Sequence, residues 1–439
     1  MTTYPVNGKH AVIIGAGMAG LLAAAAVSDV FEEVTIIEKD SLPESPRLRN
    51  GVAQGAHVHT LLGYGVEAMD SLIPGLMADV YSAGAVKIRR NFDIWFHDAI
   101  GPTPIRDVGI QTPSVTRPLL EHVTRQKVLA LANVNIRDST KMLNFEIDES
   151  DRVSGIEVMT NDIAELISAD LVVECSGRAS RLAGWLPAHG FGEVPSQRLK
   201  ILMGYTSGFF RMPRDIAENG KACLMLAVPP GYRAAYLTPV DGDMWLATMY
   251  GRGHDTAPRN HEGFVAWTKG LPHPVIHEML VPAEPVSDLK TYKIPFGIWY
   301  RYDQMPNFPQ GLIPMGEALT SFNPMYGQGM SLAAGQALSL REAIAGGLDA
   351  HLSARYFAGC HRLNSVGWSV METRDFAHDC TDGDRPADLE SRWQTAGAIR
   401  QLAEIDSEVH TLSVRVTHLL ESPSELARPE IIEKINRLS

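Results

Sequence analysis

The stretch AVIIGAGMAG, residues 11–20, joins a short apolar run to three glycines near the N-terminus. The spacing Gly15-x-Gly17-x-x-Gly20 predicts a strand over 11–14, then a tight turn and a helix. Gly15 makes the turn, Gly17 lets the backbone approach a pyrophosphate, and Gly20 lets the helix pack on the strand. The helix N-terminus would offer free N–H groups to phosphates.

A second apolar strand is predicted in EVTIIEKD, residues 33–40. It ends in Glu38, which lies 18 residues after Gly20, at the expected place for an acid that binds ribose hydroxyls. The two stretches together predict a dinucleotide site. They do not separate FAD from NAD.

The composition is that of a globular enzyme. The chain has 439 residues, of which 45% are hydrophobic and 21% charged, enough for two or three domains or one large α/β body. A formal charge of −12 argues against a non-specific nucleic-acid binder. The apolar run over 11–27 is too short for a membrane span, which needs about 20 residues. Four dispersed cysteines predict reduced thiols and a cytoplasmic location: Cys175, Cys223, Cys360 and Cys380.

Three later segments extend the pattern. Residues 115–137 predict an amphipathic helix that opens at Arg117, followed by a strand. Residues 169–186, ADLVVECSGRASRLAGWL, predict a buried strand that ends in a turn at 176–178. Residues 311–330, GLIPMGEALTSFNPMYGQGM, predict another strand and then a loop rich in glycine, whose single charge is Glu317.

Together with the N-terminal motif, these segments resemble the class A flavoprotein monooxygenases of the para-hydroxybenzoate hydroxylase fold. The loop RNGVAQGAHVHTLLGYGVEAMDSLIPGL (49–76) and the segment FNPMYGQGMS (322–331) look closest to bacterial polyketide epoxidases and related FAD-dependent natural-product enzymes. The resemblance covers most of residues 10–345. It implies FAD as the cofactor, held by Gly15, Gly17, Met18, Gly20, Glu38, Lys39, Arg49, Gln54, Arg117, Gly177, Gly316, Glu317, Pro324, Gly327, Gln328, Gly329 and Met330.

The loop before residue 331 agrees physically with a flavin site. Gly327 and Gly329 remove side chains so that backbone N–H groups can approach the ring, and Pro324 fixes the chain before them. From Ser331 the sequence reads as a helix, whose N-terminal dipole would face the charge of a reduced flavin. In the family the position of Glu317 is usually Asp, so its longer carboxylate puts the bond to the ribityl chain in doubt.

The predicted fold class is α/β, with a Rossmann-like FAD-binding domain, an antiparallel β-sheet substrate domain and a C-terminal helical region. The FAD-binding domain would comprise residues 1–83, 110–190 and 300–345, and the substrate domain 84–109 and 191–299. Residues 346–439 would form the helical region. Within the substrate domain a hairpin is predicted to turn at Asp241–Gly242, and residues 84–96 and 199–210 to join the same sheet.

The substrate side looks apolar and adaptable, since methionine fills irregular surfaces. The candidate substrate contacts are Met203, Met225, Tyr236, Trp245, Met249 and Phe322. No dedicated catalytic acid or base is evident. The resemblance therefore implies a monooxygenase that transfers one oxygen from a flavin C4a-hydroperoxide to a hydrophobic polyketide- or polyene-like substrate, by epoxidation or hydroxylation.

Alternatives stay open. Relatives of this family that fold polyenes into decalins make a redox-neutral cyclase with a structural flavin a second hypothesis, and a non-catalytic flavin-binding protein is a third. The chain has no second glycine motif, so the reductant would be NAD(P)H that binds transiently or a separate reductase. His57-x-His59 has a metal-like spacing without further ligands, and we expect no metal. No G-x-S-x-G hydrolase elbow and no W-x-W-x-I-P halogenase motif occurs.

Overall fold

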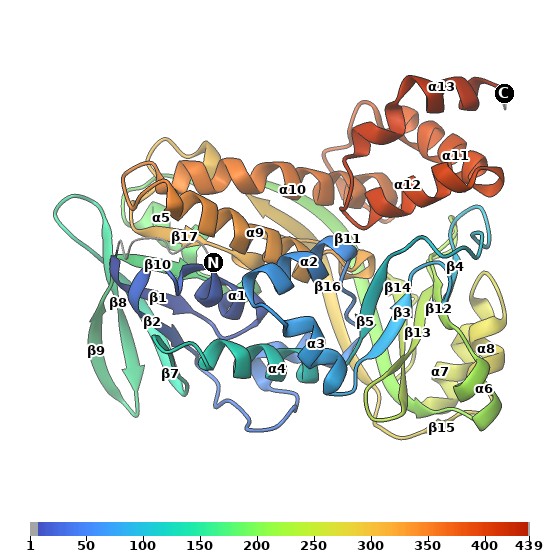
Figure 1. The fold of residues 1–439 in the computed structure, drawn as a ribbon, viewed down its shortest axis with the longest axis horizontal. Coiled ribbons are helices and arrows are strands. Elements are labelled where there is room, and N and C mark those ends of the chain that lie inside the picture. Colours follow the sequence, from blue (N-terminus) through green and yellow to red (C-terminus); the bar gives the residue numbers. More distant parts are fainter. Residues whose placement is uncertain (1–7, 438–439) are drawn as a thin grey trace.

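The N-terminal motif lies in a five-stranded parallel sheet with the strand order β17-β10-β1-β2-β6. The computed structural model describes residues 8–437, and Figure 1 shows this sheet between helices on both sides. The apolar runs of β1 and β10 are fully buried, as in parallel sheets covered on both faces. The predicted strands and their order along the chain are confirmed. Their bounds are β1 (Gly8–Ile14), β2 (Phe31–Ile37), β6 (Val134–Arg137), β10 (Leu171–Glu174) and β17 (Leu312–Pro314).

Helices α1 (Met18–Val27) and α9 (Gly329–Ala345) pack against each other beside this sheet. Both present small residues: Ala23–Ala26 of α1 and Ala333, Ala334 and Ala337 of α9 are buried. Small side chains let the two helices approach closely. Helix α9 begins at Gly329, two residues before the predicted start at Ser331.

The amphipathic helix α4 (Arg117–Leu129) begins at Arg117 as predicted. Thr116 caps it, because its hydroxyl accepts a hydrogen bond from the N–H of Leu119. Three further helices lie in the N-terminal half: α2 (Gly63–Leu72), α3 (Leu76–Ser82) and α5 (Leu182–Ala188). A separate antiparallel sheet lies next to the parallel sheet, at the left in Figure 1, and was not predicted from the sequence. Its strands are β7 (Thr140–Ile147), β8 (Val153–Thr160) and β9 (Ile163–Ser168).

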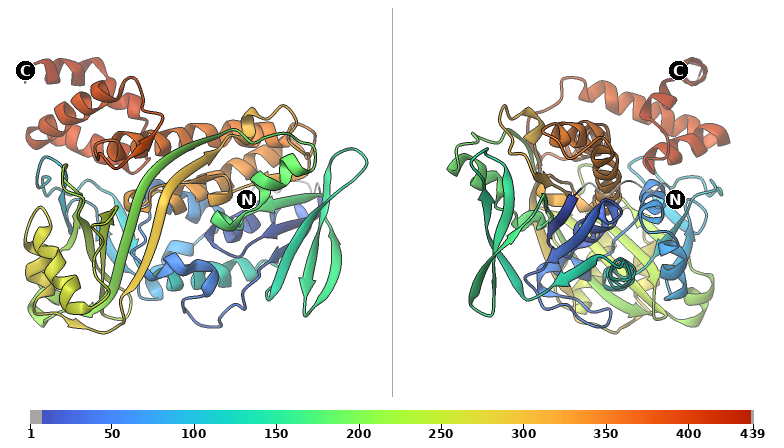
Figure 2. Two further views of the ribbon diagram at one scale, coloured as in Figure 1. Left: turned by 180° about the vertical axis from the view of Figure 1, so that it is seen from behind. Right: turned by 60° about the vertical axis from the view of Figure 1, so that its left-hand side comes forward.

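A second, larger sheet fills the other half of the molecule. Its order is β18-β16-β11-β14-β13-β12-β4, and β15 and β19 pair with β11. Figure 2 shows the long strands β11 and β16 running side by side across the molecule. The bounds are β4 (Ile94–His97), β11 (Ser196–Arg211), β12 (Ala222–Met225), β13 (Ala234–Val240), β14 (Met244–Arg252), β15 (Glu284–Pro285), β16 (Lys290–Tyr300), β18 (Thr320–Ser321) and β19 (Asp382–Gly383).

The hairpin predicted at Asp241–Gly242 is confirmed, since β13 and β14 pair in antiparallel register up to Val240 and Met244. The prediction for residues 84–96 is wrong in part. Strand β3 (Val86–Arg89) pairs with β5 (Gln111–Ser114) in a separate two-stranded sheet, and β4 joins the large sheet by a parallel pairing with β12. Short strands of this kind carry too little pattern to specify a partner.

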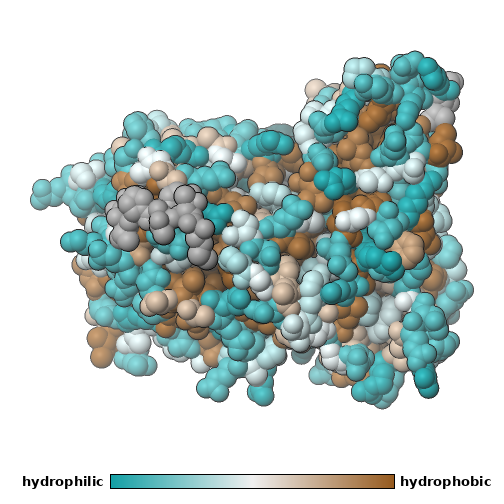
Figure 3. Space-filling view, viewed as in Figure 1, coloured by the Kyte–Doolittle hydropathy of each residue, from teal (hydrophilic) through white to brown (hydrophobic). Residues whose placement is uncertain are grey.

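Two groups of helices cover the large sheet. Helices α6 (Arg214–Asn219), α7 (His261–Trp267) and α8 (Val275–Leu280) lie on its outer side, beyond β13 and β12 (Figure 1). The long helix α10 (Leu352–Asp375) packs on α9. Three more helices follow it in the region predicted to be helical: α11 (Leu389–Ile405), α12 (Ser407–Thr417) and α13 (Pro429–Asn436). Figure 3 shows apolar side chains among these last helices, at the upper right. Within residues 8–437, no helix has the length and apolar character needed to cross a membrane.

Candidate functional site

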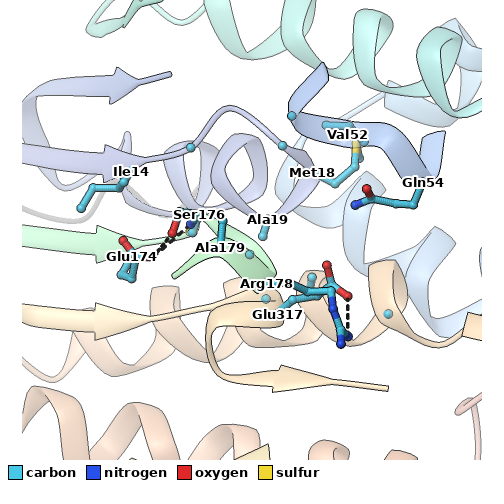
Figure 4. A pocket seen from close by; sticks show the side chains of 18 of the residues that line it. Ile14, Met18, Ala19, Val52, Gln54, Glu174, Ser176, Arg178, Ala179 and Glu317 are labelled. Atoms are coloured by element: carbon cyan, nitrogen blue, oxygen red, sulfur yellow. Dashed lines mark hydrogen bonds and ion pairs between the residues drawn. The ribbon is translucent and has the colours of Figure 1, made fainter. Parts of the chain in front are cut away.

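A cavity of about 990 Å³ lies between the parallel sheet and the large sheet. This volume is at the upper end of the range of about 300–1,000 Å³ found for small-molecule sites. Met18, Val52 and Gln54 lie on one side of it, and Arg178 and Glu317 on the other (Figure 4). It brings together most of the residues that the sequence analysis selected: Gly15, Gly17, Met18, Glu38, Lys39, Arg49, Gln54, Arg117, Gly177, Gly316, Glu317, Phe322, Pro324, Gly327, Gly329 and Met330.

Two of the residues selected for the cofactor lie beside the cavity without lining it. A Cβ on Gly20 would lie 1.8 Å from the carbonyl oxygen of Gly15, so Gly20 permits the close contact of helix and strand. Gln328 is buried under the loop, and its Oε1 has no hydrogen-bond partner among the described residues.

The glycine turn leaves the N-terminus of α1 open to the cavity. Gly15 has a φ of +99°, and a Cβ on it would lie 2.7 Å from the carbonyl oxygen of Cys175. Gly17 is the N-cap of α1, no side chain caps the helix, and its first turn contains no acid. Uncapped N–H groups at the positive end of a ten-residue helix fit an anionic group such as a pyrophosphate.

A buried network of charges forms the wall next to this turn. Arg49 Nη1 lies 3.0 Å from Glu38 Oε2 and 3.3 Å from Asp40 Oδ2, and its Nε donates to Glu121 Oε1 at 2.8 Å. Arg117 Nη2 donates to the other oxygen of Glu121 at 2.6 Å. Burial alone would raise the pKa of Glu121, but the two guanidinium groups outweigh burial and hold this pKa below its ordinary value.

Glu38 occupies the position expected for a ribose-binding acid. Its Oε2 accepts a hydrogen bond from the N–H of Ala16 at 2.9 Å, and its Oε1 accepts one from the N–H of Asp40 at 3.0 Å. A carboxylate offers about four acceptor sites. With Arg49 as the third partner, Glu38 keeps capacity for a hydroxyl group in the cavity.

The carboxylate of Glu317 faces the cavity from η5 (Gly316–Ala318). It lies 3.9 Å from Nη1 of Arg178, which projects from η2 (Gly177–Ala179), and its side chain is 36% exposed (Figure 4). Its separation from bulk solvent raises its pKa, and Arg178 and Arg117 oppose this shift. The side chain is thus turned toward the cavity, where it can meet a ligand.

His57 and His59 line the cavity in the loop after η1 (Asn50–Ala56). His57 Nδ1 is 2.7 Å from the hydroxyl of Ser207, while His59 Nδ1 is 2.9 Å from the carbonyl oxygen of His57. Burial lowers the pKa of His57 to about 3 and that of His59 to about 4, so both rings are neutral near pH 7. Across the described chain, no cluster of three or more His, Cys, Asp or Glu residues could hold a metal ion.

The large sheet contributes a row of three tyrosines that sequence reasoning missed. Tyr205 of β11 pairs across strands with Tyr250 of β14 and with Tyr292 of β16. All three line the cavity, and their ring centroids are 5.6 Å and 5.8 Å apart. His57 packs edge-on against Tyr205. The alternation of side chains in β-strands was the available signal, but it needs the pairing register to place residues from three strands in one row.

Five of the six proposed substrate contacts do not line this cavity. Met225, Trp245 and Met249 point to the opposite face of the sheet, where α7 and α8 cover them. This follows from the period of two along β14, because Tyr250 lines the cavity and Met249 and Trp245 therefore face away. Met203 and Tyr236 lie on the cavity side but are buried in the core around it, and Phe322 alone of the six lines the cavity.

Comparison with solved structures gives the fold. The flavin-dependent brominase Bmp2 has a similar structure, with a TM-score of 0.68 and 17% identity over 98% of this chain and 100% of that one. PqsL of Pseudomonas aeruginosa, a probable FAD-dependent monooxygenase, has a TM-score of 0.66 and 18% identity, over 89% and 99%. The Diels-Alderase PyrE3 of pyrroindomycin biosynthesis has a TM-score of 0.63 and 14% identity, over 93% and 80%. The chain therefore has the flavoprotein monooxygenase fold.

The sequence comparison gives the family. Protein Rv3254 of Mycobacterium tuberculosis (strain ATCC 25618 / H37Rv) is 33% identical to the chain over 348 residues, which are 76% of this chain and 73% of that protein. The chain belongs to the family of Protein Rv3254. No family model matches it.

Proposed function

We propose that the protein is an FAD-dependent monooxygenase that transfers one oxygen atom to a hydrophobic, polyketide- or polyene-like substrate, by epoxidation or hydroxylation. The observation that carries this proposal is the continuity of the cavity. It extends from the phosphate-type turn at Gly15 and Gly17, past Glu38, to the glycine loop at Gly327 and the tyrosine row of the large sheet. One cavity can thus hold a long dinucleotide and a second molecule next to it.

We propose the following cofactor contacts from the residues in the walls of the cavity. The N-terminus of α1 would bind the pyrophosphate, and Glu38 a ribose hydroxyl. Glu317 would accept a hydrogen bond from the ribityl chain, and the backbone between Pro324 and Gly329 would face the flavin ring. The remaining selected residues, among them Lys39, Arg49 and Gln54, would complete the wall around the nucleotide.

The bound flavin would supply the activation of oxygen, and the chain would supply position, dryness and hydrogen bonds. Tyr205, Tyr250 and Tyr292 face the space beside the glycine loop. Burial raises the pKa of each of the three, so their hydroxyl groups stay protonated near pH 7 and can donate to a substrate oxygen. The reaction would also need water kept from the reacting end of the flavin, because water diverts it to hydrogen peroxide.

The test is anaerobic stopped-flow mixing of the FAD-loaded protein with NADH or NADPH, with and without a panel of polyenes and polyketides, followed by addition of oxygen. We expect one compound to accelerate flavin reduction and then to gain one oxygen atom in mass. Reduced protein that releases only hydrogen peroxide with every compound would contradict the proposal. A requirement for a flavin reductase would instead identify a separate protein as the electron donor.

A redox-neutral cyclase is the second candidate, and the likeness to the Diels-Alderase PyrE3 favours it. In that case FAD would be structural, and the cavity would fold a polyene for ring closure. Incubation with oxidised FAD, without NAD(P)H and without oxygen, separates the two. A product of unchanged mass would replace the monooxygenase proposal.

We also propose a cytoplasmic location, because the four cysteines are all free and three of them are buried. The partners we propose are a small hydrophobic substrate and an electron donor.

A further inference from the structure

A buried polar cluster joins three parts of the chain behind the cavity. Arg252 ends β14, Asp375 ends α10, and Asn323 and Tyr326 belong to the loop at η6 (Pro324–Tyr326). The side chains of Arg252 and Asp375 are both 0% exposed and form an ion pair. The cluster thus couples the large sheet and the C-terminal helices to the glycine loop.

A single oxygen of Asp375 accepts hydrogen bonds from the other three side chains of this cluster. Oδ1 accepts from Arg252 Nη2, from Asn323 Nδ2 at 2.9 Å and from the hydroxyl of Tyr326 at 2.7 Å. Oδ2 of Asp375 and Nε of Arg252 are buried without a hydrogen-bond partner among the described residues. Oδ1 of Asp375 thus binds the loop, while Oδ2 of Asp375 and Nε of Arg252 lack partners.

Such an arrangement is a poor way to gain stability. A buried ion pair can often be replaced by apolar side chains of similar volume without loss of stability, and unsatisfied polar atoms add a cost. The pair does fix positions, because a charged acceptor makes strong hydrogen bonds that hold the side chains of its donors in place. The cluster is therefore better explained by the conformation that it imposes on the loop.

The loop held by this cluster, around η6, lines the cavity. Asn323 is 0% exposed, and both polar atoms of its side-chain amide are used. Its Nδ2 donates to Asp375, and its Oδ1 accepts a hydrogen bond from the N–H of Met325 at 3.1 Å. Pro324 and Gly327 line the cavity, and Gly327 has the left-handed φ of +65° that turns the chain into α9. Tyr326, by contrast, is not among the cavity-lining residues.

We propose that Asp375 is a positioning residue for the cofactor. Through Asn323 and Tyr326 its carboxylate fixes the peptide groups between Pro324 and Gly329 in the orientation that binds the flavin ring. This inference rests on the proposed FAD site. It gives the end of α10 a role in cofactor binding although Asp375 does not touch the cavity.

The test compares FAD binding in variants that leave the cavity wall intact. Tyr326→Phe removes one donor and keeps the ion pair, and the double variant Arg252→Met with Asp375→Leu replaces the pair with apolar side chains. Asp255→Asn is the matched control, because Asp255 belongs to a partly exposed pair with Arg233 and also bonds Trp267, outside the loop. The readouts are the FAD dissociation constant, the midpoint potential of the bound flavin, and the melting temperature of the FAD-free protein.

We expect the dissociation constant to rise about threefold to tenfold in Tyr326→Phe and more than about tenfold in the double variant, since a hydrogen bond to a charged group is lost in each. The potential shifts to more negative values in both, because the loop N–H groups no longer face the charge of the reduced ring. The FAD-free double variant melts within a few degrees of the wild type. The control changes FAD affinity by less than about twofold.

Unchanged affinity and potential in both variants would overturn this inference alone. A wild-type chain that does not bind FAD would overturn the proposed function and this inference with it. If the double variant does not fold, the result for Tyr326→Phe decides. A double variant that loses melting temperature but binds FAD with the wild-type constant would assign the cluster to stability and overturn the positioning role.

Discussion

Replacing Arg49 with methionine tests the charge network beside the glycine turn. Arg49 contacts three carboxylates, and the side chains of Arg49, Glu38 and Glu121 are only 6–7% exposed. Removing one partner of a buried pair costs about 3–5 kcal/mol, because the other charge stays buried without compensation. Arg117 remains on the second oxygen of Glu121, so we expect the lower end of this range, a loss of about 3 kcal/mol in the free energy of unfolding.

The dependence on pH gives a second check. Since the folded state lowers the pKa of Glu121, its ion pairs stabilise the protein above the pKa of the unfolded chain, about 4.3, and this stability is lost as the pH falls through the folded value. In Arg49→Met part of this contribution is already missing. The difference in the free energy of unfolding between wild type and variant is therefore largest near pH 7 and narrows as the pH falls below about 4.3.

The assay is equilibrium unfolding in urea of the FAD-free protein, followed by circular dichroism at several pH values, so that cofactor binding plays no part. Arg214→Met is the control, because the pair of Arg214 with Glu218 is exposed and its loss costs less than about 0.5 kcal/mol. A variant within about 1 kcal/mol of the wild type at pH 7.5, or a difference that does not change with pH, would refute the network as a source of stability.

Three further changes test other parts of the site. Glu317→Gln is expected to raise the FAD dissociation constant about threefold to tenfold in a flavin fluorescence titration, and an unchanged constant would show that Glu317 only resembles the family's aspartate. Gly20→Ala places a Cβ 1.8 Å from the Gly15 carbonyl oxygen and should cost about 3 kcal/mol in urea unfolding, whereas Gly397→Ala, with open space around it, should stabilise by about 0.5–1 kcal/mol. Met249→Leu should leave FAD affinity unchanged and cost less than about 1.5 kcal/mol in the same assay, because Met249 faces the helices; weaker FAD binding would put it on the cavity side.

The nucleotide half of the fold could be predicted because its signals are local. The turn at Gly15, the acid at Glu38 and the helix that opens at Arg117 each depend on residues close together in the chain. The loop at 322–331 likewise carries its glycines and proline in one short segment. In the structure the residues of these separate motifs line one cavity.

The substrate side could not be predicted in the same way. All but the first residue of β14 are buried, so its sequence carries no contrast between its two faces. Choosing its large residues selected Trp245 and Met249, which lie on the face away from the cavity. The tyrosine row needs the register of three strands. Long-range charge pairs are invisible for a similar reason: Arg49 meets Glu121 across 72 positions, and Arg252 meets Asp375 across 123.

The long strands β11 and β16 constrain how molecules reach the cavity. They pair continuously, apart from one irregularity between Lys200 and Met203, from Ser196 and Tyr300 at one end to Ser207 and Lys290 at the other, and so cross from one half of the molecule to the other (Figure 2). A hinge that opened the two halves would have to break ladder hydrogen bonds of this pair. We therefore expect ligands to exchange with solvent through the opening at which the side chain of Glu317 is 36% exposed, without separation of the two halves.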